Sequence, residues 1–455
     1  MIACSYGVSC RSTDARRGKA VGGNFLQEEL TAVASSGGPD ATGPSARLDA
    51  LTFLLIFLYA VVAMMFIREL VIPLYMSSID GILPGDPSYY HQIARAQAEA
   101  IRSQGLAAFE LRPEGQGPAG IASLLYLVSP APQAIVVLNS LLHAVAGVAL
   151  IKLLMNWFAR RVAVLAALPF VVSPYMIVWF SQLNKDSFAA AGAMLLLAGF
   201  VGMIMALLRR DKLGGQVLVA LCGVALLWVV RPYLNQILLP IIGGVVMVCT
   251  VLALRRPRDH RSGSLVPFVC HAILLLLALS TFDSGARSDE TLAKFSGFSA
   301  REYEEIVPKG TVADACIDRV DQDVWETLDF LPDYMNERLR ALAAQRCMVF
   351  TILYADSNQF TQRSVVDAEV LLSGAAEAIE YIPRALMLGV LSPWPSAWFM
   401  EVEQRRSIFY TIVALEVLLL YMGLFALVCW LCISRQWSVL VPFIIVLAVL
   451  TVYGM

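Results

Sequence analysis

Long uninterrupted runs of apolar residues recur along the chain, and their length is the first structural signal. A helix that crosses a membrane needs about 17–25 predominantly apolar residues. Nine runs are predicted to be transmembrane helices, at about 50–68, 131–153, 162–180, 187–208, 215–231, 235–254, 265–282, 409–433 and 437–454. A shorter apolar piece, Ile121 to Val128, lies between Pro118 and Pro130. It is predicted to be a re-entrant or interfacial segment.

Composition supports the membrane assignment and narrows the class of protein. The 455 residues are 58% hydrophobic and 15% charged, and the mean hydropathy is +0.67. These values lie outside the range of ordinary soluble domains. The predicted fold class is an all-α membrane protein, a polytopic helical bundle of about nine transmembrane helices with a mainly helical extracytoplasmic domain. The lipid bilayer is its expected surrounding, and the net charge of -2 predicts no nucleic-acid partner.

Basic residues in the short loops predict the orientation, because such loops stay preferentially in the cytoplasm. Five basic groups fall on one side if the N-terminus is cytoplasmic: residues 16–19, 152–161, 209–212 and 255–261, and Arg435. The segments expected on the other side are 76–130, 181–186, 231–235 and 283–408. The sequence therefore predicts a multi-pass protein of the cell membrane, the inner membrane in a bacterium, with its active site on the extracytoplasmic face.

The predicted organisation has four parts. They are a disordered cytoplasmic tail at 1–47, a transmembrane module at 48–282 with its first outer loop at 76–130, an extracytoplasmic helical domain and interfacial segment at 283–408, and a C-terminal transmembrane pair at 409–455. Apolar spacing predicts helices within the outer domain at 324–330, 333–347 and 363–382. Cys316 and Cys347 are the only thiols of that domain, so a disulfide between them is expected.

Polar side chains gather directly after the first apolar run. They are the carboxylates of Asp80 and Asp86, followed by Tyr89, Tyr90 and His91. Prolines and glycines on either side of Asp86 predict a non-helical turn before an amphipathic helix at 87–104. An acid followed by proline is a common helix start. Asp86 is therefore either a reactive carboxylate or the cap of that helix.

Motifs in the first half of the chain resemble those of a known superfamily. They are Asp86-Pro87-Ser88-Tyr89-Tyr90-His91, Gly117-Pro118-Ala119-Gly120, Ser173-Pro174-Tyr175-Met176 and Asn184-Lys185-Asp186. With a cytoplasmic N-terminus, they resemble the GT-C superfamily of membrane glycosyltransferases over residues 50 to about 210. The resemblance implies transfer of a sugar from a polyprenyl-phosphate carrier to a glycan, lipid or protein acceptor on the outer face, with Asp86 as the catalytic carboxylate. Many members carry a second acid where this chain has Pro87, which leaves Asp80 as an alternative.

A polyprenyl-phosphate donor needs cations near the membrane for its departing phosphate. The candidates are Lys185 in a turn between two spans, Arg231 at the outer end of the fifth span, and Arg384 in the outer segment. The residues expected to bind substrate are Asp80, Tyr89, Tyr90 and His91. Lys185 and Arg231 also have ordinary interpretations, because lysine snorkels to the membrane surface and arginine often marks the boundary of a span.

Three other classes of function are open from the sequence. A polysaccharide polymerase would hold two carrier phosphates with outer arginines, and a non-catalytic assembly subunit would need no reactive carboxylate. A flippase or transporter of lipid-linked sugars would need ionisable groups inside its spans. Glu416, in the eighth span, is either such a group or the partner of a hydrogen bond to a neighbouring helix. No His, Cys, Asp and Glu set has metal-ligand spacing, so no cofactor is expected. A divalent ion would have to bind Asp80 and Asp86 together with backbone or phosphate oxygens.

Overall fold

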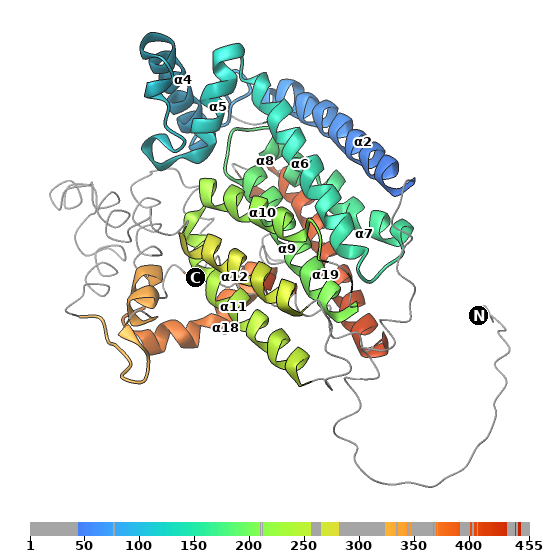
Figure 1. Cartoon of the computed structure of the whole chain (residues 1–455). Coiled ribbons are helices and arrows are strands. Elements are labelled where there is room, and N and C mark those ends of the chain that lie inside the picture. The colour runs from blue at the N-terminus through green and yellow to red at the C-terminus, as the bar shows by residue number, and fades with distance from the viewer. Residues whose placement is uncertain are drawn as a thin grey trace, which may run out of the picture. The chain divides into compact units, whose positions relative to one another are not determined.

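The structure is a computed structural model that is almost entirely helical (Figure 1). It describes residues 44–75, 78–209, 211, 213–255, 265–281, 324–333, 335–343, 346, 367, 370, 372–391, 401–402, 405–406, 408–434, 442 and 445–446. Two short strands, β1 (Glu401–Val402) and β2 (Arg405–Arg406), pair antiparallel. Apart from this pair of strands, the regular structure of the described part of the chain is helical, as the apolar runs predict.

Five helices among the described residues are long and apolar enough to cross a membrane. The first combines α2 (Pro44–Phe66), the π-helical turn η1 (Ile67–Val71) and α3 (Ile72–Tyr75). The others are α6 (Gln133–Leu154), α9 (Asp186–Arg209), α11 (Pro232–Leu254) and α19 (Ile408–Ser434). A helix satisfies its own backbone hydrogen bonds and can therefore cross lipid. With five such helices, the chain is a membrane protein. Because α2 begins at Pro44, the predicted tail gives way to helix before residue 47.

One predicted span, 162–180, is broken into two helices. These are α7 (Arg160–Val172) and α8 (Pro174–Phe180), which meet at 55°. Pro174 has no N–H to continue the first helix. Ser173 starts the second one instead, because its Oγ accepts a hydrogen bond from the Met176 N–H at 3.1 Å.

Three further predicted spans are not confirmed at full length. The helices α10 (Gln216–Val230) and α12 (Leu265–Thr281) are apolar but shorter than the other spans. Arg231 and Pro232 separate α10 from α11, so the predicted loop 231–235 is reduced to a single non-helical residue. Most of the ninth predicted span, 437–454, lies outside the described residues.

The break between α7 and α8 accounts for Glu416 on α19. One oxygen of its carboxylate accepts from Ser173 Oγ at 3.0 Å and from the Tyr175 N–H at 3.1 Å. Backbone N–H groups at the start of a helix have no partner within that helix and need one elsewhere. Of the two interpretations of Glu416, the structure shows the contact with a neighbouring helix, in which Glu416 is the acceptor.

Helices α9 and α10 pack closely because glycines line their contact. A Cβ built on Gly199 would lie 2.5 Å from the Ala220 nitrogen, and one built on Gly223 would lie 2.4 Å from the Leu196 nitrogen. Both distances are too short for a real side chain, so small residues allow the two backbones to approach. Helix α6 contacts α2 as well as α9, and these four helices form the bundle that supports the site.

The end of the bundle at which α2 begins is rich in basic residues. Asp49 accepts from Arg160 Nη1 at 2.6 Å and also pairs with Lys152. Arg209, at the end of α9, donates to the carbonyl of Asn156 at 2.6 Å. Basic residues from two of the predicted cytoplasmic loops therefore lie at one end of the helices, as expected. The opposite end carries the start of α9 and the end of α10.

Two helices fold onto this opposite end. The first, α4 (Asp86–Gln104), confirms the helix predicted at 87–104. Two short 3₁₀ turns, η2 (Leu106–Ala108) and η3 (Pro113–Gly115), lead to α5 (Gly117–Val128), which is the short apolar piece of the sequence. Their shared core contains Tyr90, Ala94, Ala98, Ala119, Ala122, Tyr126 and Leu183. Leu183 belongs to the α8–α9 turn, so this core fixes α4 and α5 to the bundle.

The residues described between 324 and 391 have a small core of their own. It packs Trp325 against Tyr381 and other residues of α18 (Ala375–Leu391). Glu326 bridges the start of α18, because its N–H donates to the Ser373 carbonyl at 3.1 Å and its carbonyl accepts from the Ala375 N–H at 2.9 Å.

The sequence reading of this outer segment needs two corrections. The prediction of a helix at 324–330 is wrong, because these residues form turns and the bridge to Gly374. The helix predicted from residue 363 starts only at Ala375 within the described residues. Cys316 and Cys347, the predicted disulfide, lie outside the described residues.

Candidate functional site

Four segments far apart in sequence meet at the end of the bundle opposite Asp49. They are the start of α4, the loop before α5, the α8–α9 turn and the α10–α11 junction. A Cβ on Gly117 would lie 2.0 Å from the Val229 carbonyl, so the α5 loop is held directly against the end of α10. We call this meeting point the Asp86 site and define it as Asp86, Tyr90, Arg112, Lys185, Asp186 and Arg231.

Asp86 presents an exposed carboxylate at the first residue of α4. The residue that precedes the helix as its N-cap is Gly85, and the α4 start has no side-chain capping bond. Instead, Asp86 Oδ2 accepts a hydrogen bond from Tyr90 Oη at 3.0 Å. Residues four apart lie on the same helix face, so the sequence spacing itself pairs this carboxylate with this phenol. The carboxylate is thereby oriented and remains accessible.

Lys185 lies beside this pair. Its Nζ is 5.5 Å from the centroid of the Tyr90 ring, a distance typical of a cation–π contact. Burial lowers the pKa of Lys185; the Asp86 carboxylate opposes this shift, and Arg231 adds to it. Among the described residues, no carboxylate lies within 4 Å of Lys185. Lys185 is a half-buried cation that faces Asp86 without being paired to it.

The turn that carries Lys185 is held by buried polar side chains. Asn139 of α6 donates to the carbonyls of Phe180 and Gln182, at 2.8 and 2.7 Å, and accepts from Ser187 Oγ at 2.9 Å. Asn184 donates to the Trp179 carbonyl at 2.6 Å. Each of these bonds satisfies a group that would otherwise be buried without a partner. The turn is therefore a fixed part of the bundle.

Arg231 reaches the site from the α10–α11 junction. It is the one non-helical residue there, because Pro232 begins α11 and cannot donate a backbone hydrogen bond to continue α10. Its Nη2 donates to Asp186 Oδ1 at 2.6 Å, and 18% of the Arg231 side chain is exposed. Asp186 is the first residue of α9, directly after Lys185. This ion pair joins the two helix starts at the site.

Arg112 is a third cation, which the sequence reading missed. It lies in the loop before α5, and its guanidinium carbon is 5.9 Å from the centroid of the Trp228 ring. Burial lowers the pKa of Arg112, and its charge also acts on Lys185. No carboxylate lies within 4 Å of Arg112 in the described ranges. The signal in the sequence was its place in the first outer loop, near the Gly117-Pro118 motif.

Tyr89 stands at the rim of the site. Its Oη donates to the Glu114 carboxylate at 2.6 Å, and both side chains are exposed. This hydrogen bond raises the pKa of Tyr89. It also ties the α5 loop, which carries Arg112, to the first turn of α4.

His91 does not belong to the Asp86 site. It lies five residues after Asp86, which corresponds to about 140° around a helix. The side chain is 3% exposed, and its Nδ1 is hydrogen-bonded to Tyr126 Oη of α5. Burial lowers the pKa of His91 to about 3, with smaller effects from the charges of Arg68 and Arg95. The expectation that His91 lines the same site as Asp86 is not supported.

Asp80 is placed in a tight turn before the site. Ile79 and Ile82 exchange two backbone hydrogen bonds, of 3.1 and 2.9 Å. The two residues between them, Asp80 and Gly81, both have positive φ, of 53° and 70°. This is the geometry of a type I′ turn, which favours Asp-Gly. Asp80 has a local structural explanation that does not involve Asp86.

Arg384 belongs to a different cluster. Its Nε and Nη2 donate to the two oxygens of Asp367, at 2.7 and 2.8 Å. Tyr381 Oη donates to the same carboxylate at 3.2 Å, and Arg346 donates to the Asp367 carbonyl at 2.6 Å. The Arg384 hydrogen bond lowers the pKa of Asp367. Arg384 therefore fills a structural role within the segment 324–391.

The Asp86 site offers a ligand the exposed Asp86 carboxylate and three cations, of which Arg231 is paired with Asp186. Within the described residues, no three His, Cys, Asp or Glu side chains come together in a way that could hold a metal ion. No family model, curated protein or solved structure matches the chain. The chemistry of the site is therefore the basis for assigning a function.

Proposed function

We propose that the protein is a membrane glycosyltransferase that moves a sugar from a polyprenyl-phosphate carrier to an acceptor hydroxyl. The observation that carries the proposal is the meeting of Asp86 with Lys185, Arg231 and Arg112 at one end of the membrane bundle. A base for the acceptor and cations for the leaving phosphate are the two requirements of this reaction. In this proposal a lipid carrier reaches both from the bilayer.

Asp86 acts as the general base. Its carboxylate takes the proton of the acceptor hydroxyl while the hydroxyl oxygen attacks the anomeric carbon of the sugar. The bond from this carbon to the phosphate oxygen breaks, and its electron pair leaves with the carrier phosphate. Tyr90 holds the carboxylate in place through the 3.0 Å hydrogen bond. General-base catalysis of this kind typically contributes about 10²–10⁴ in rate.

Lys185, Arg231 and Arg112 bind the phosphate of the donor. Lys185 and Arg112 are half-buried without a carboxylate within 4 Å among the described residues, so an anion would complete their surroundings. Arg231 is preset by Asp186, which holds the guanidinium at the junction. The three cations exceed the two carboxylates of the site by one charge. A phosphodiester donor carries one negative charge, and the site then becomes neutral.

The proposal includes the orientation predicted from the basic loops. The Asp86 site lies at the end of the helices opposite Lys152, Arg160 and Arg209. If that basic end is cytoplasmic, the site faces the extracytoplasmic side. Reporter fusions at Arg258 should then read as cytoplasmic and fusions near Asp86 as external. An external reading at Arg258 would overturn the orientation.

The experiment that tests the function is sugar transfer by purified protein in lipid nanodiscs. A panel of polyprenyl-phosphate sugars with a radiolabelled sugar serves as donor, and membrane lipids and glycans serve as acceptors. We expect transfer by the wild type and by Asp80→Asn, since asparagine also tolerates the left-handed turn position. Transfer by Asp86→Asn should be slower by about 10²–10⁴-fold. Transfer by Asp86→Asn at the wild-type rate would remove Asp86 from the mechanism.

A polymerase of lipid-linked repeat units is the second candidate. The observation that favours it is the third cation, because Arg112 adds to the capacity of the site for phosphate. A polymerase must hold a donor and an acceptor that both carry lipid phosphates. Product length separates the two proposals: a transferase adds one sugar, whereas a polymerase yields a ladder of repeat units.

A further inference from the structure

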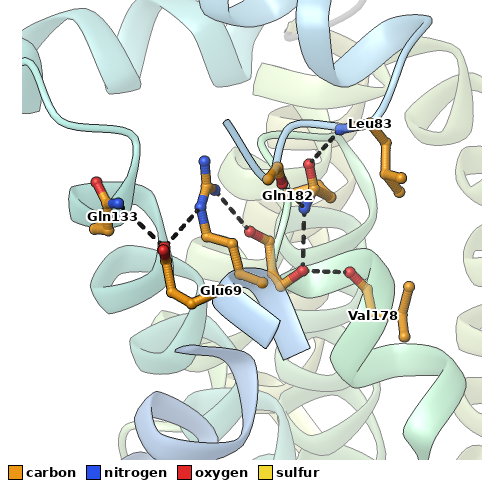
Figure 2. Close-up of polar contacts among 8 residues, drawn as sticks. Glu69, Leu83, Gln133, Val178 and Gln182 are labelled. Carbon is orange, nitrogen blue, oxygen red and sulfur yellow. Dashed lines mark hydrogen bonds and ion pairs between the residues drawn. The ribbon is translucent and has the colours of Figure 1, made fainter. Parts of the chain in front are cut away.

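A buried polar cluster joins the loop before Asp86 to the turn before Lys185. It consists of Arg68, Gly81, Leu83, Ser181 and Gln182, and we call it the Arg68–Gln182 cluster. Figure 2 shows Gln182 beside Leu83, with the polar contacts that connect them to the end of the first span. Nothing in the reaction itself requires these side chains.

Gln182 connects the two segments through both ends of its amide. Its Nε2 donates to the Gly81 carbonyl at 3.0 Å, and its Oε1 accepts from the Leu83 N–H at 3.1 Å. The side chain is fully buried. A buried glutamine amide that both donates and accepts a hydrogen bond fixes the position of the loop that it contacts.

Arg68 holds the same place from the first span. It lies in the π-helical turn η1 and is 0% exposed, although arginine is almost never fully buried. Its Nη1 donates to the Ser181 carbonyl at 3.2 Å. Its own carbonyl lies against Gly81, where an added Cβ would be 2.8 Å away. Arg68 therefore contacts the loop and the turn at once.

The charge of Arg68 is only weakly compensated. Its Nε is 3.6 Å from a carboxylate oxygen of Glu69, whose side chain is 53% exposed and also accepts from Gln133 at 3.1 Å. Burying a guanidinium with so distant a partner is costly. A π-helical turn is itself rare and often occurs at functional sites. A positional role for Arg68 explains why both features are present together.

The distances along the chain make this cluster a determinant of the site. Leu83 precedes Asp86 by three residues, and Gln182 precedes Lys185 by three residues. Three residues span at most about 10–11 Å of chain. Fixing Leu83 to Gln182 therefore limits how far Asp86 can move relative to Lys185.

We infer that Gln182 and Arg68 are positioning residues that set the geometry between the Asp86 carboxylate and the Lys185 ammonium. The inference rests on the proposed function for what these two groups do, the base and the phosphate ligand. The cluster acts on the alignment of acceptor and donor. It leaves each substrate's own binding contacts unchanged.

Kinetics test this role with Gln182→Met, which keeps the side-chain volume and loses the two hydrogen bonds to the loop before Asp86 as well as the one to Ser181 Oγ. A misplacement of a catalytic group by about 1 Å costs on the order of 10² in rate. We expect kcat to fall by about that factor while the affinity for polyprenyl phosphate stays within about twofold. At position 68, we expect a higher kcat for Arg68→Lys than for Arg68→Met, because lysine retains a donor for the Ser181 carbonyl.

His143→Leu is the matched control. His143 is also fully buried, and its Nε2 is hydrogen-bonded to the Val171 carbonyl at 2.9 Å. It belongs to the bundle but not to the Asp86 site or the Arg68–Gln182 cluster. We expect a loss of thermal stability comparable to that of Gln182→Met, with kcat per folded molecule unchanged. An equal fall of kcat in both variants would mean that Gln182 is merely structural.

Hydrogen exchange tests the cluster without any enzymatic assay. Gln182→Met should accelerate amide exchange at Leu83 and in the peptide 79–85, and His143→Leu should leave that peptide unchanged. If the wild type transfers no sugar but the exchange result is as expected, the proposed function is wrong. The cluster then still fixes the loop 79–85 to the turn before Lys185. Wild-type kcat and unchanged exchange in Gln182→Met would overturn the inference.

Discussion

Two arginine–aspartate pairs in this protein differ in their surroundings. Arg384 donates two hydrogen bonds to the Asp367 carboxylate, and Tyr381 donates a third. Arg346 donates to the backbone carbonyl of the same aspartate. Arg231 contacts Asp186 with one guanidinium nitrogen, next to Lys185. In the first cluster, both oxygens of the Asp367 carboxylate accept hydrogen bonds from residues of the same segment. The second contains two cations, Lys185 and Arg112, that have no carboxylate within 4 Å among the described residues and that lie beside an accessible carboxylate.

The comparison shows that an ion pair does not by itself indicate a binding site. What distinguishes the Asp86 site is a pair of half-buried cations beside an exposed carboxylate, where an anionic ligand gains most. Lys185 and Arg112 have no carboxylate within 4 Å among the described residues. We therefore expect substitutions in the two clusters to separate cleanly, with functional effects in one and stability effects in the other.

The largest effect is expected for Asp86→Asn. The amide keeps the shape of the side chain and can still accept from Tyr90, but it cannot take a proton. Turnover should fall by about 10²–10⁴-fold, and donor affinity should change little, because the base acts in the transition state. Single-turnover transfer and equilibrium binding of the donor measure the two quantities separately.

A smaller effect is expected for the cations. Lys185→Met and Arg231→Ala each remove one charge-assisted contact, which is worth about 1.5–3 kcal/mol, or about 10- to 100-fold in the dissociation constant of polyprenyl phosphate. Arg112→Met should act in the same direction. Titration of the purified variants in nanodiscs measures this constant. An unchanged dissociation constant in all three variants would show that polyprenyl phosphate does not bind at this site.

Arg384→Ala provides the opposite result in the other cluster. It should leave donor affinity and turnover at wild-type values and lower the free energy of unfolding by about 1 kcal/mol, because the Arg384 side chain is 42% exposed. Thermal unfolding with tryptophan fluorescence measures the shift, since Trp325 belongs to the same core. A loss of donor affinity in this variant would show that the two regions are not functionally distinct.

A prediction outside the two clusters concerns pH and His91. Burial lowers the pKa of this histidine to about 3, against an ordinary value of 6.5. Between these values the unfolded chain takes up a proton that the folded protein does not, so this contribution to stability is complete above pH 6.5 and decreases as the pH falls. His91→Gln should therefore lose less stability than the wild type between pH 7.5 and 5. If thermal unfolding shows that both proteins lose the same stability between pH 7.5 and 5, His91 does not have a lowered pKa.

Much of the site was accessible from the sequence because it lies at the ends of apolar runs. Asp86, Lys185 and Arg231 were predicted on one side of the membrane, and the structure brings them together. The pairing of Asp86 with Tyr90 follows from their spacing of four residues. The same helical spacing turns His91 away, which the run of polar residues in the sequence concealed.

Other features could not be derived from pattern alone. Arg68 stands at the edge of an apolar run, and a π-helical turn with its changed register has no simple sequence signal. Arg384 was predicted near a phosphate because of its position along the chain, but its partner Asp367 depends on how the segment 324–391 folds. The bend at Ser173 and Pro174 interrupts a run whose composition is uniformly apolar. In each case tertiary contacts decide the outcome.

The central claim is that Lys185, Arg231 and Arg112 hold a carrier phosphate within reach of Asp86. A cryo-electron microscopy map of the protein in nanodiscs with polyprenyl phosphate tests it most directly. The account predicts phosphate density in contact with Lys185 and at least one of the two arginines, and no such density in Lys185→Met. Phosphate density beside Arg384 and Arg346, with the Asp86 site empty, would contradict it.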